Sequence, residues 1–185
     1  MKNPKKILII IQRSNGDVLM ASTLIKYLYE YYNVPKIDLL VNNDTIAVAK
    51  LLPYINSIIE FSYQKKRDQR WMQEKKIILS IFRKYDLSIN LTASDRSVLY
   101  ALIASKKSIS AVEKTKNKSW WKTFLLSHHY YFDSAKHILF NNLKPLKLLK
   151  IQYDLIHISP TISEKISLKV TKKLINNGIK DFIIF

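Results

Sequence analysis

Residues 6–28, KILIIIQRSNGDVLMASTLIKYL, contain the pattern that decides the fold class. They open with an apolar run at residues 7–11, pass through a polar stretch at residues 12–17, and continue with apolar residues at three- and four-residue steps. The run is typical of a buried β-strand, and the later spacing predicts an amphipathic helix over residues 18–32. A strand, a tight turn and a helix in this order begin a βαβ unit.

The same alternation continues along the chain. Short apolar or β-branched runs follow at residues 37–41, 57–61, 87–91 and 108–112. Helical patterns or turn residues separate them, and further helices are expected at residues 45–52, 72–82 and 95–104. Ser94 or Asp95 can cap the first turn of the last of these helices. We therefore expect an α/β fold, a Rossmann-like parallel sheet with helices on both faces.

The pattern is less regular after residue 112. Residues 113–122 mix lysines with Trp120 and Trp121 without a clear period, so we expect a loop or an irregular arm. Helical spacing returns over residues 138–149, where Pro145 is expected to kink the helix or to start a second segment.

The last part of the chain predicts a second structural unit. Residues 157–160 resemble a linker, and Thr161 with Glu164 predicts a capping box for a helix through Asn176. Gly178 suits the position after that helix, and residues 181–185 predict the start of another strand. We expect residues 1–156 to form a Rossmann-like domain and residues 157–185 to be the linker, helix and first strand of an incomplete second domain.

Composition limits the classes of function. The net charge of +17 favours polyanionic partners, which include nucleic acid, an anionic membrane face and a phosphorylated glycolipid. Part of this charge can also reflect lysines that only solvate helix faces. The sequence has no cysteine, and its four histidines do not follow a metal-site pattern, so we expect no metal. It also lacks an apolar run of the length that spans a membrane, so we expect a cytoplasmic protein.

The polar stretch after the first strand lies where α/β folds place ligands. Gly16 is expected to permit a positive φ or a close approach of the backbone to a ligand. Asp17 has two interpretations: a general base that takes a proton from an acceptor hydroxyl, or a cap of the following helix, which spacing alone favours. Neither the dinucleotide-binding glycine pattern nor the phosphate-loop pattern occurs here.

Cations follow the third and fourth predicted strands. Arg96 follows the fourth strand, and a basic cluster follows the third, comprising Lys65, Lys66, Arg67 and Arg70. We expect both at the same sheet edge as Asp17, where they can hold phosphates. The alternatives are a solvated helix face for the cluster and a salt bridge with Asp95 or a neighbour for Arg96.

Residues 114–122 interleave lysines with Trp120 and Trp121. This composition suits a membrane interface or single-stranded nucleic acid. The alternative is that the tryptophans close the edge of the core.

Several segments, taken in order, resemble the N-terminal domain of glycosyltransferase family 9, the heptosyltransferases. They are residues 6–28, KIDLLV at 36–41, LLPYINSIIEF at 51–61 and KYDLSINLTASDRSVLYALIASKKSISAV at 84–112. INLTASDRS, the tryptophan-containing arm and KHILFNNLKPL at 136–146 are most similar to the heptosyltransferase III branch. The resemblance extends from residue 6 to about residue 151, and residues 181–185 match the strand that opens the second domain.

The resemblance implies a GT-B enzyme of two Rossmann-like domains that transfers heptose from ADP-heptose, with inversion, to an inner-core acceptor. Asp17 matches the family's proposed catalytic base, Gly16 matches the glycine of the same motif, and Arg13 matches a basic residue of the heptosyltransferase III branch. The donor belongs to the family's C-terminal domain, so no donor or cofactor residue is assigned, and we expect this chain alone to be inactive. Residues 21–23 depart from the family's Thr-Thr-Pro-like turn.

The resemblance also implies partners. They are a phosphorylated inner-core glycolipid, the inner leaflet of the inner membrane as a peripheral surface, and a second domain that a separate chain could supply; no nucleic acid is expected. One rival is a non-catalytic basic domain that binds nucleic acid or an anionic membrane. Another is an unrelated nucleotide-using enzyme on the same fold.

Overall fold

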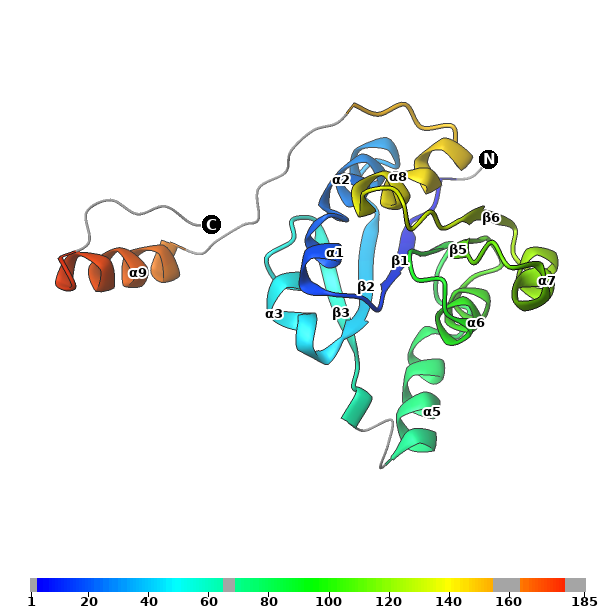
Figure 1. The fold of residues 1–185 in the computed structure, drawn as a ribbon, viewed down its shortest axis with the longest axis horizontal. Helices are drawn as coiled ribbons and strands as arrows, with labels where there is room; N and C mark the ends of the chain where they lie inside the picture. The colour runs from blue at the N-terminus through cyan, green and yellow to red at the C-terminus, as the bar shows by residue number, and fades with distance from the viewer. Residues whose placement is uncertain (1–2, 65–68, 155–163, 179–185) are drawn as a thin grey trace.

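A single parallel sheet organises the computed structural model, which describes residues 3–64, 69–154 and 164–178. Within these residues six strands are hydrogen-bonded in the order β3-β2-β1-β4-β5-β6, and every pair is parallel (Figure 1). The strands are β1 (Lys6–Ile11), β2 (Lys36–Asn42), β3 (Ile55–Phe61), β4 (Leu87–Asn90), β5 (Ser108–Val112) and β6 (His128–Tyr131). The predicted fold class is confirmed.

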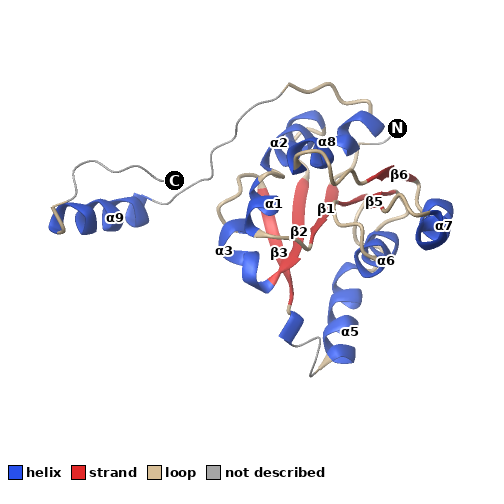
Figure 2. Cartoon of the chain, viewed as in Figure 1, coloured by secondary structure: helices blue, strands red, loops and turns tan. Residues whose placement is uncertain are grey.

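Helices cover both faces of the sheet (Figure 2). The bounds of the helices, on the sheet and beyond it, are α1 (Asn15–Leu19), α2 (Ser22–Tyr31), α3 (Ile46–Ala49), α5 (Arg70–Ile81), α6 (Asp95–Ala104), α7 (Lys116–Leu125), α8 (Ile138–Leu148) and α9 (Glu164–Asn176), with a 3-10 turn η1 (Asn43–Thr45). Helices α1, α2, α3 and α8 pack on one face, and α5 and α6 pack on the other. Because both faces are covered, β1 is apolar at nearly every position instead of alternating.

Alternate residues of the strands belong to different cores. Ile9 and Ile11 of β1 pack beneath α2 and α8, whereas Leu8 and Ile10 pack beneath α5 and α6. The same alternation in β2 and β3 places Leu40 and Phe61 on the α5/α6 face. This period of two fixes which side chains share a face at the ends of the strands.

The helix expected over residues 18–32 is divided into α1 and α2. The backbone N–H of Ala21 bonds the carbonyl of Val18 at 3.1 Å, a three-residue step that tightens the chain between the two helices. Leu24, Ile25 and Leu28 of α2 are buried, as their spacing predicted. The division falls where the sequence departs from the family's helix turn.

One other expectation is wrong, and of the two alternatives for Pro145 the start of a second segment is wrong. The irregular arm at residues 113–122 is mostly helical, as α7, and Trp121 packs against a small core of Val98, Val112 and Leu126. The segment at residues 138–149 is one helix, α8, with Pro145 inside it. Pro145 itself is buried, and its carbonyl accepts a hydrogen bond from the N–H of Leu149 at 3.0 Å, so α8 continues past it.

Helix α9 ends at Asn176, as the sequence predicts, and Gly178 has a positive φ of 70°. This helix lies away from the sheet in Figure 1. The expected linker at 157–160, the cap at Thr161 and the strand at 181–185 lie outside the described residues. In the described ranges no helix is both long and apolar enough to cross a membrane.

Candidate functional site

The turn between β1 and α1 is closed by a reciprocal cap. Ser14 is the N-cap residue, and its Oγ accepts a hydrogen bond from the N–H of Asp17 at 3.4 Å. In return, Oδ2 of Asp17 accepts a hydrogen bond from the N–H of Ser14 at 3.3 Å. Asp17 therefore has the capping role that spacing favoured, although as the third residue of the helix and not as its N-cap.

Arg13 approaches the same carboxylate. Its Nε lies 2.9 Å from Oδ2 of Asp17, and its guanidinium stacks 4.7 Å from the ring centroid of Phe132. Oδ2 thus accepts two hydrogen bonds, from Arg13 and from Ser14, whereas no described residue donates to Oδ1. One oxygen of Asp17 holds the turn, and the other remains available to a ligand.

Of the two expectations for Gly16, the positive φ is wrong, and the close approach of the backbone to a ligand stays a prediction. Gly16 is the second residue of α1, and its φ is not positive. A Cβ at this position would meet no heavy atom within 4 Å. The glycine is therefore not required by backbone conformation, and it leaves open space beside Asp17.

The loop between β4 and α6 supports the turn through a buried polar network centred on Asn90. Nδ2 of Asn90 donates to the carbonyl of Thr92 at 2.6 Å and to Oγ of Ser110 at 2.8 Å, and Oδ1 accepts from the N–H of Thr92 at 3.0 Å. Oγ of Thr92 then accepts from the backbone N–H of Gln12 at 2.9 Å. The network joins the carboxyl end of β4 to that of β1.

Arg96, in the first turn of α6, reaches the end of β3. Its guanidinium lies 3.9 Å from the ring centroid of Phe61. The alternative of a salt bridge with Asp95 is wrong, because Asp95 pairs with Lys122 of α7 at 2.6 Å. Ser94 caps α6 by accepting from the N–H of Ser97 at 3.3 Å, as predicted.

The basic cluster is described only in part. Arg70 is the first residue of α5 and is exposed. The first turn of α5 is attached to the end of β3, because the side chain of Gln73 bonds both the N–H and the carbonyl of Ser62. This places Arg70 toward the carboxyl ends of the strands but not in contact with Asp17. Three cluster members lie outside the described residues: Lys65, Lys66 and Arg67.

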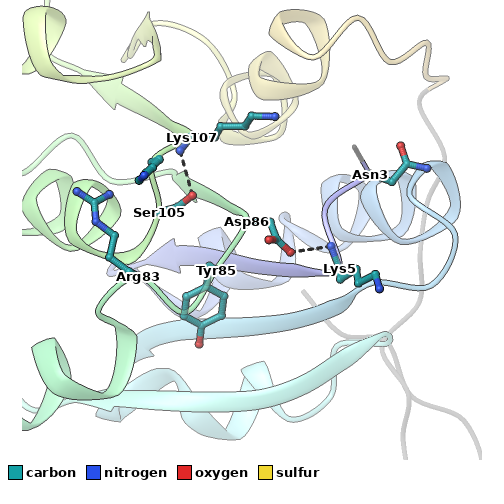
Figure 3. A pocket seen from close by; sticks show the side chains of 8 residues that line it. Asn3, Lys5, Arg83, Tyr85, Asp86, Ser105 and Lys107 are labelled. Atoms are coloured by element: carbon teal, nitrogen blue, oxygen red, sulfur yellow. Dashed lines mark hydrogen bonds between the residues drawn. The ribbon is translucent and has the colours of Figure 1, made fainter. Parts of the chain in front are cut away.

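A cavity of about 470 Å³ lies at the opposite edge of the sheet, at the amino ends of β1, β4 and β5 (Figure 3). Lys5, Arg83, Asp86 and Lys107 line it, and Oδ2 of Asp86 accepts hydrogen bonds from the backbone N–H groups of Lys5 and Lys6. Parallel sheets of this kind place ligands at the carboxyl ends. We therefore assign the candidate site to the carboxyl edge and not to this cavity.

Sequence reasoning missed polar residues at the candidate edge. Gln12 and Asn42 are buried at the carboxyl ends of β1 and β2, and each has a side-chain atom without a hydrogen-bond partner among the described residues. The signal was a carboxamide directly after an apolar strand, in Ile11–Gln12 and Val41–Asn42. In the same described ranges no group of three or more His, Asp or Glu side chains could hold a metal ion.

The strand order and the residues at the carboxyl edge define a class of protein. Doubly wound sheets of the order 3-2-1-4-5-6 are Rossmann-like, and ligands bind outside their carboxyl ends. The chain has the fold of the N-terminal domain of a GT-B glycosyltransferase.

Comparison with known proteins shows which proteins the chain resembles in sequence. No protein-family model matches the chain. The chain is 27% identical to lipopolysaccharide heptosyltransferase 3 of Escherichia coli strain K12 over 181 residues, which is 93% of the chain and 50% of that protein. A second Escherichia coli heptosyltransferase 3 is 27% identical over 113 residues, or 60% of the chain and 33% of that protein. The chain thus spans half or less of the length of these curated relatives.

Solved structures share the fold. The family 9 glycosyl transferase of Veillonella parvula superposes with a TM-score of 0.78 at 16% identity, over 100% of this chain and 53% of that one. ADP-heptose lipopolysaccharide heptosyltransferase II of Escherichia coli gives a TM-score of 0.67 at 17% identity, over 91% of this chain and 50% of that one. The resemblance to glycosyltransferase family 9, with most similarity to heptosyltransferase III, is therefore confirmed.

Proposed function

We propose that this chain supplies the acceptor side and the catalytic base of a glycosyltransferase of lipopolysaccharide core synthesis. The enzyme would transfer heptose from ADP-heptose, with inversion, to a phosphorylated inner-core acceptor. The observation that carries the proposal is the carboxylate of Asp17 at the carboxyl edge, with Oδ2 held by Arg13 and Ser14 and Oδ1 without a described donor. The heptosyltransferase 3 relatives support the substrate class.

Asp17 would act as a general base. Its Oδ1 takes the proton of an acceptor hydroxyl while that oxygen attacks the anomeric carbon of the donor, and the bond from that carbon to the diphosphate breaks so that ADP leaves with the electron pair. A single displacement from the opposite face inverts the anomeric carbon. Arg13 holds the carboxylate in one orientation, and the open space at Gly16 allows the acceptor to approach.

Cations beyond Asp17 would hold the acceptor's phosphates. Arg70 stands exposed at the start of α5, and the guanidinium of Arg96 lies over Phe61. Lys65, Lys66 and Arg67 precede Arg70 in the sequence and belong to the same proposal. Arginine suits this role because its planar group can contact two phosphate oxygens at once.

The donor would be bound elsewhere. We propose that residues 1–156 form the acceptor-side domain and that residues 157–185 begin a donor-binding domain, which the same or a separate chain supplies. The full-length relatives are at least twice as long as the matched segments, which leaves room for such a domain. ADP-heptose is then a substrate of the whole enzyme, and this chain requires no cofactor of its own.

Helix α7 would rest on the cytoplasmic face of the inner membrane, where the acceptor lipid is found. Trp120 is 69% exposed and Phe124 is 83% exposed, four residues apart on one face of the helix, and Leu125 is exposed beside them. Lys122 of the same helix is buried and Trp121 is partly buried, so only Trp121 closes the core. Exposed aromatics on a basic protein suit an anionic lipid interface.

Binding of the acceptor tests the proposal. Arg67→Ala combined with Arg70→Ala should weaken binding of phosphorylated inner-core glycolipid, and the loss should shrink as salt is raised, because screened phosphate contacts carry that affinity. Lys106→Ala, at the opposite edge of the sheet, is the matched control and should bind as the wild type does. An unchanged affinity in the double variant would contradict the phosphate assignment. Tighter binding of single-stranded nucleic acid than of glycolipid at physiological salt would instead support the non-catalytic basic domain.

A further inference from the structure

Three buried polar side-chain groups at the carboxyl edge have atoms without partners. Both Nε2 and Oε1 of Gln12, Oδ1 of Asn42 and Nε of Arg96 are buried, and none has a hydrogen-bond partner among the described residues. Gln12 is only 6% exposed and Asn42 only 5% exposed. Buried polar atoms in folded proteins are almost always hydrogen-bonded, so such a group at a ligand-binding edge requires an explanation.

These residues lie on one face of the sheet. Ile10 and Leu40 belong to the core beneath α5 and α6, and two residues further along each strand are Gln12 and Asn42, which the period of two puts on the same face. Asn42 pairs directly with Phe61 of β3, and Ile11 pairs with Val41, so Gln12 and Asn42 are neighbours across the strands. The guanidinium of Arg96 covers Phe61 from above, at 3.9 Å.

The backbone holds this row in place. The N–H of Gln12 is bonded to Oγ1 of Thr92, and the carbonyl of Asn42 accepts from Oγ1 of Thr45 at 2.9 Å. One backbone group of each residue is therefore bonded, while both amide atoms of Gln12 and Oδ1 of Asn42 have no partner among the described residues. A row with fixed backbones and unpaired side chains is preorganised for a ligand that supplies the missing partners.

We propose that Gln12, Asn42 and Arg96 form a subsite for the hydroxyl groups of a sugar ring, the acceptor sugar if the proposed function is correct. The carboxamide of Gln12 offers one acceptor and a donor group, Oδ1 of Asn42 offers an acceptor, and Nε of Arg96 offers a donor. A sugar hydroxyl both donates and accepts, so adjacent hydroxyls satisfy all of these atoms. A phosphate oxygen only accepts, and it would leave the two amide oxygens unpaired.

The subsite changes the role of Arg96. The sequence and the proposed function both treat Arg96 as a cation for phosphate, like Arg70, and the subsite replaces that assignment for Arg96. Its Nε now belongs to a mixed set of donors and acceptors, whereas Arg70 is exposed and separate. The sugar hydroxyls would thus be recognised by Gln12, Asn42 and Arg96. The phosphates would be recognised at a different place, by the basic cluster.

Gln12→Met provides a test with two independent readouts. Methionine keeps nearly the volume and removes the unpaired amide, so the melting temperature should stay the same or rise. Gln73→Met is the matched control: its amide is bonded to both backbone groups of Ser62, so its melting temperature should fall. A fall in Gln12→Met as large as that in Gln73→Met would show that the Gln12 amide already has partners, and would overturn the proposal.

Calorimetric titration of the chain supplies the second readout, with delipidated, dephosphorylated inner-core oligosaccharide and with free aldoheptose. Gln12→Met and Asn42→Leu should each weaken sugar binding about tenfold. Wild-type affinity in both variants would overturn the subsite and leave the proposed function intact. Binding of free aldoheptose but not of the oligosaccharide would keep the subsite and contradict the proposed acceptor. Binding of neither sugar by the wild-type chain would overturn the subsite; the proposed function is tested separately, by binding of the phosphorylated glycolipid.

Discussion

Nε of Arg13 lies 2.9 Å from Oδ2 of Asp17, and the backbone N–H of Ser14 reaches the same oxygen. The two interpretations of Asp17, helix cap and general base, are therefore compatible, because the cap uses one oxygen of the carboxylate. The other oxygen accepts nothing from the described residues. Because the two roles use different oxygens of the carboxylate, they can be tested separately.

Asp17→Asn should separate them. Asparagine retains a side-chain oxygen that can accept from Ser14 but cannot take a proton, so heptose transfer should fall by roughly 100-fold or more while the melting temperature changes little. The measurement needs the chain joined to a family 9 C-terminal domain. Asp44→Asn, at an exposed aspartate in η1, is the control and should retain activity. Full activity of Asp17→Asn would show that Asp17 only caps the helix and is not the general base.

The strands were the most predictable part of the fold. The five runs predicted within the described residues are all strands of the sheet. The signal is strongest for β1, which is buried on both faces and is therefore a continuous apolar run after Lys6. Strand β6 was missed, because His128–Tyr131 has only Tyr130 buried at the edge of the sheet and gives no apolar run. Helix α7 was missed because its burial rests on Lys122 and Ser119 as well as on Trp121, which disguises the helical period.

The pair of Lys122 and Asp95 is asymmetric, and this predicts unequal costs of mutation. Lys122 is fully buried, with Nζ 2.6 Å from Asp95 and 3.3 Å from the carbonyl of Ala93, whereas the side chain of Asp95 is 70% exposed. Removing Asp95 leaves a buried cation with one neutral partner; removing Lys122 leaves a carboxylate that water can solvate. Asp95→Ala should therefore destabilise the fold by roughly 1–3 kcal/mol more than Lys122→Met.

Urea unfolding of the two variants at neutral pH measures this difference. Asp95 also lies in the first turn of α6, where a negative charge is favourable. Asp95→Asn loses this charge as Asp95→Ala does but keeps a side-chain oxygen for Lys122, so comparing the two variants separates the charge effect from the contact with Lys122. Equal costs for Asp95→Ala and Lys122→Met would show that Lys122 is hydrated and that the pair does not anchor α7.

Two tyrosines should make stability fall at alkaline pH. Burial raises the pKa of Tyr85 well above its usual value, and the hydrogen bond from its hydroxyl to Asp38 adds to the shift. Burial likewise raises the pKa of Tyr100, and its hydrogen bond to Glu74 adds to the shift. The folded state thus keeps both hydroxyls protonated at a pH where the unfolded chain loses the protons. Their contribution is complete below about pH 10 and is lost as pH rises beyond it.

Denaturant titrations between about pH 9 and 12 test this dependence. The free energy of unfolding of the wild type should decline, with each tyrosine contributing up to about 1.4 kcal/mol per pH unit. Tyr85→Phe combined with Tyr100→Phe should be less stable at neutral pH and have a shallower decline. Tyr131→Phe, at a half-exposed tyrosine, should keep the wild-type slope. A double variant as steep as the wild type would contradict the assignment.

The candidate site was less predictable than the fold. Asp17 and Arg13 could be named because a short polar turn after a strand is a local signal. The contact of Arg96 with Phe61 joins residues from β3 and α6, and the bond from Gln12 to Thr92 joins residues 80 positions apart. Such contacts depend on strand order and register, which no local pattern contains. Gln12 and Asn42 have a local signal, a carboxamide at the end of an apolar run, but their position beside each other and beside Arg96 again depends on strand register.

The last prediction concerns the donor. If a separate domain binds the nucleotide, residues 1–185 alone should show no measurable binding of ADP or ADP-heptose by calorimetry and no transfer to a core acceptor, since catalysis requires both substrates to be oriented together. Acceptor binding should persist in the same preparation, which controls for folding. Joining a family 9 C-terminal domain should restore both nucleotide binding and transfer. Clear binding of ADP-heptose by residues 1–185 would show that the donor site lies within this chain, and would contradict the proposed division of the enzyme.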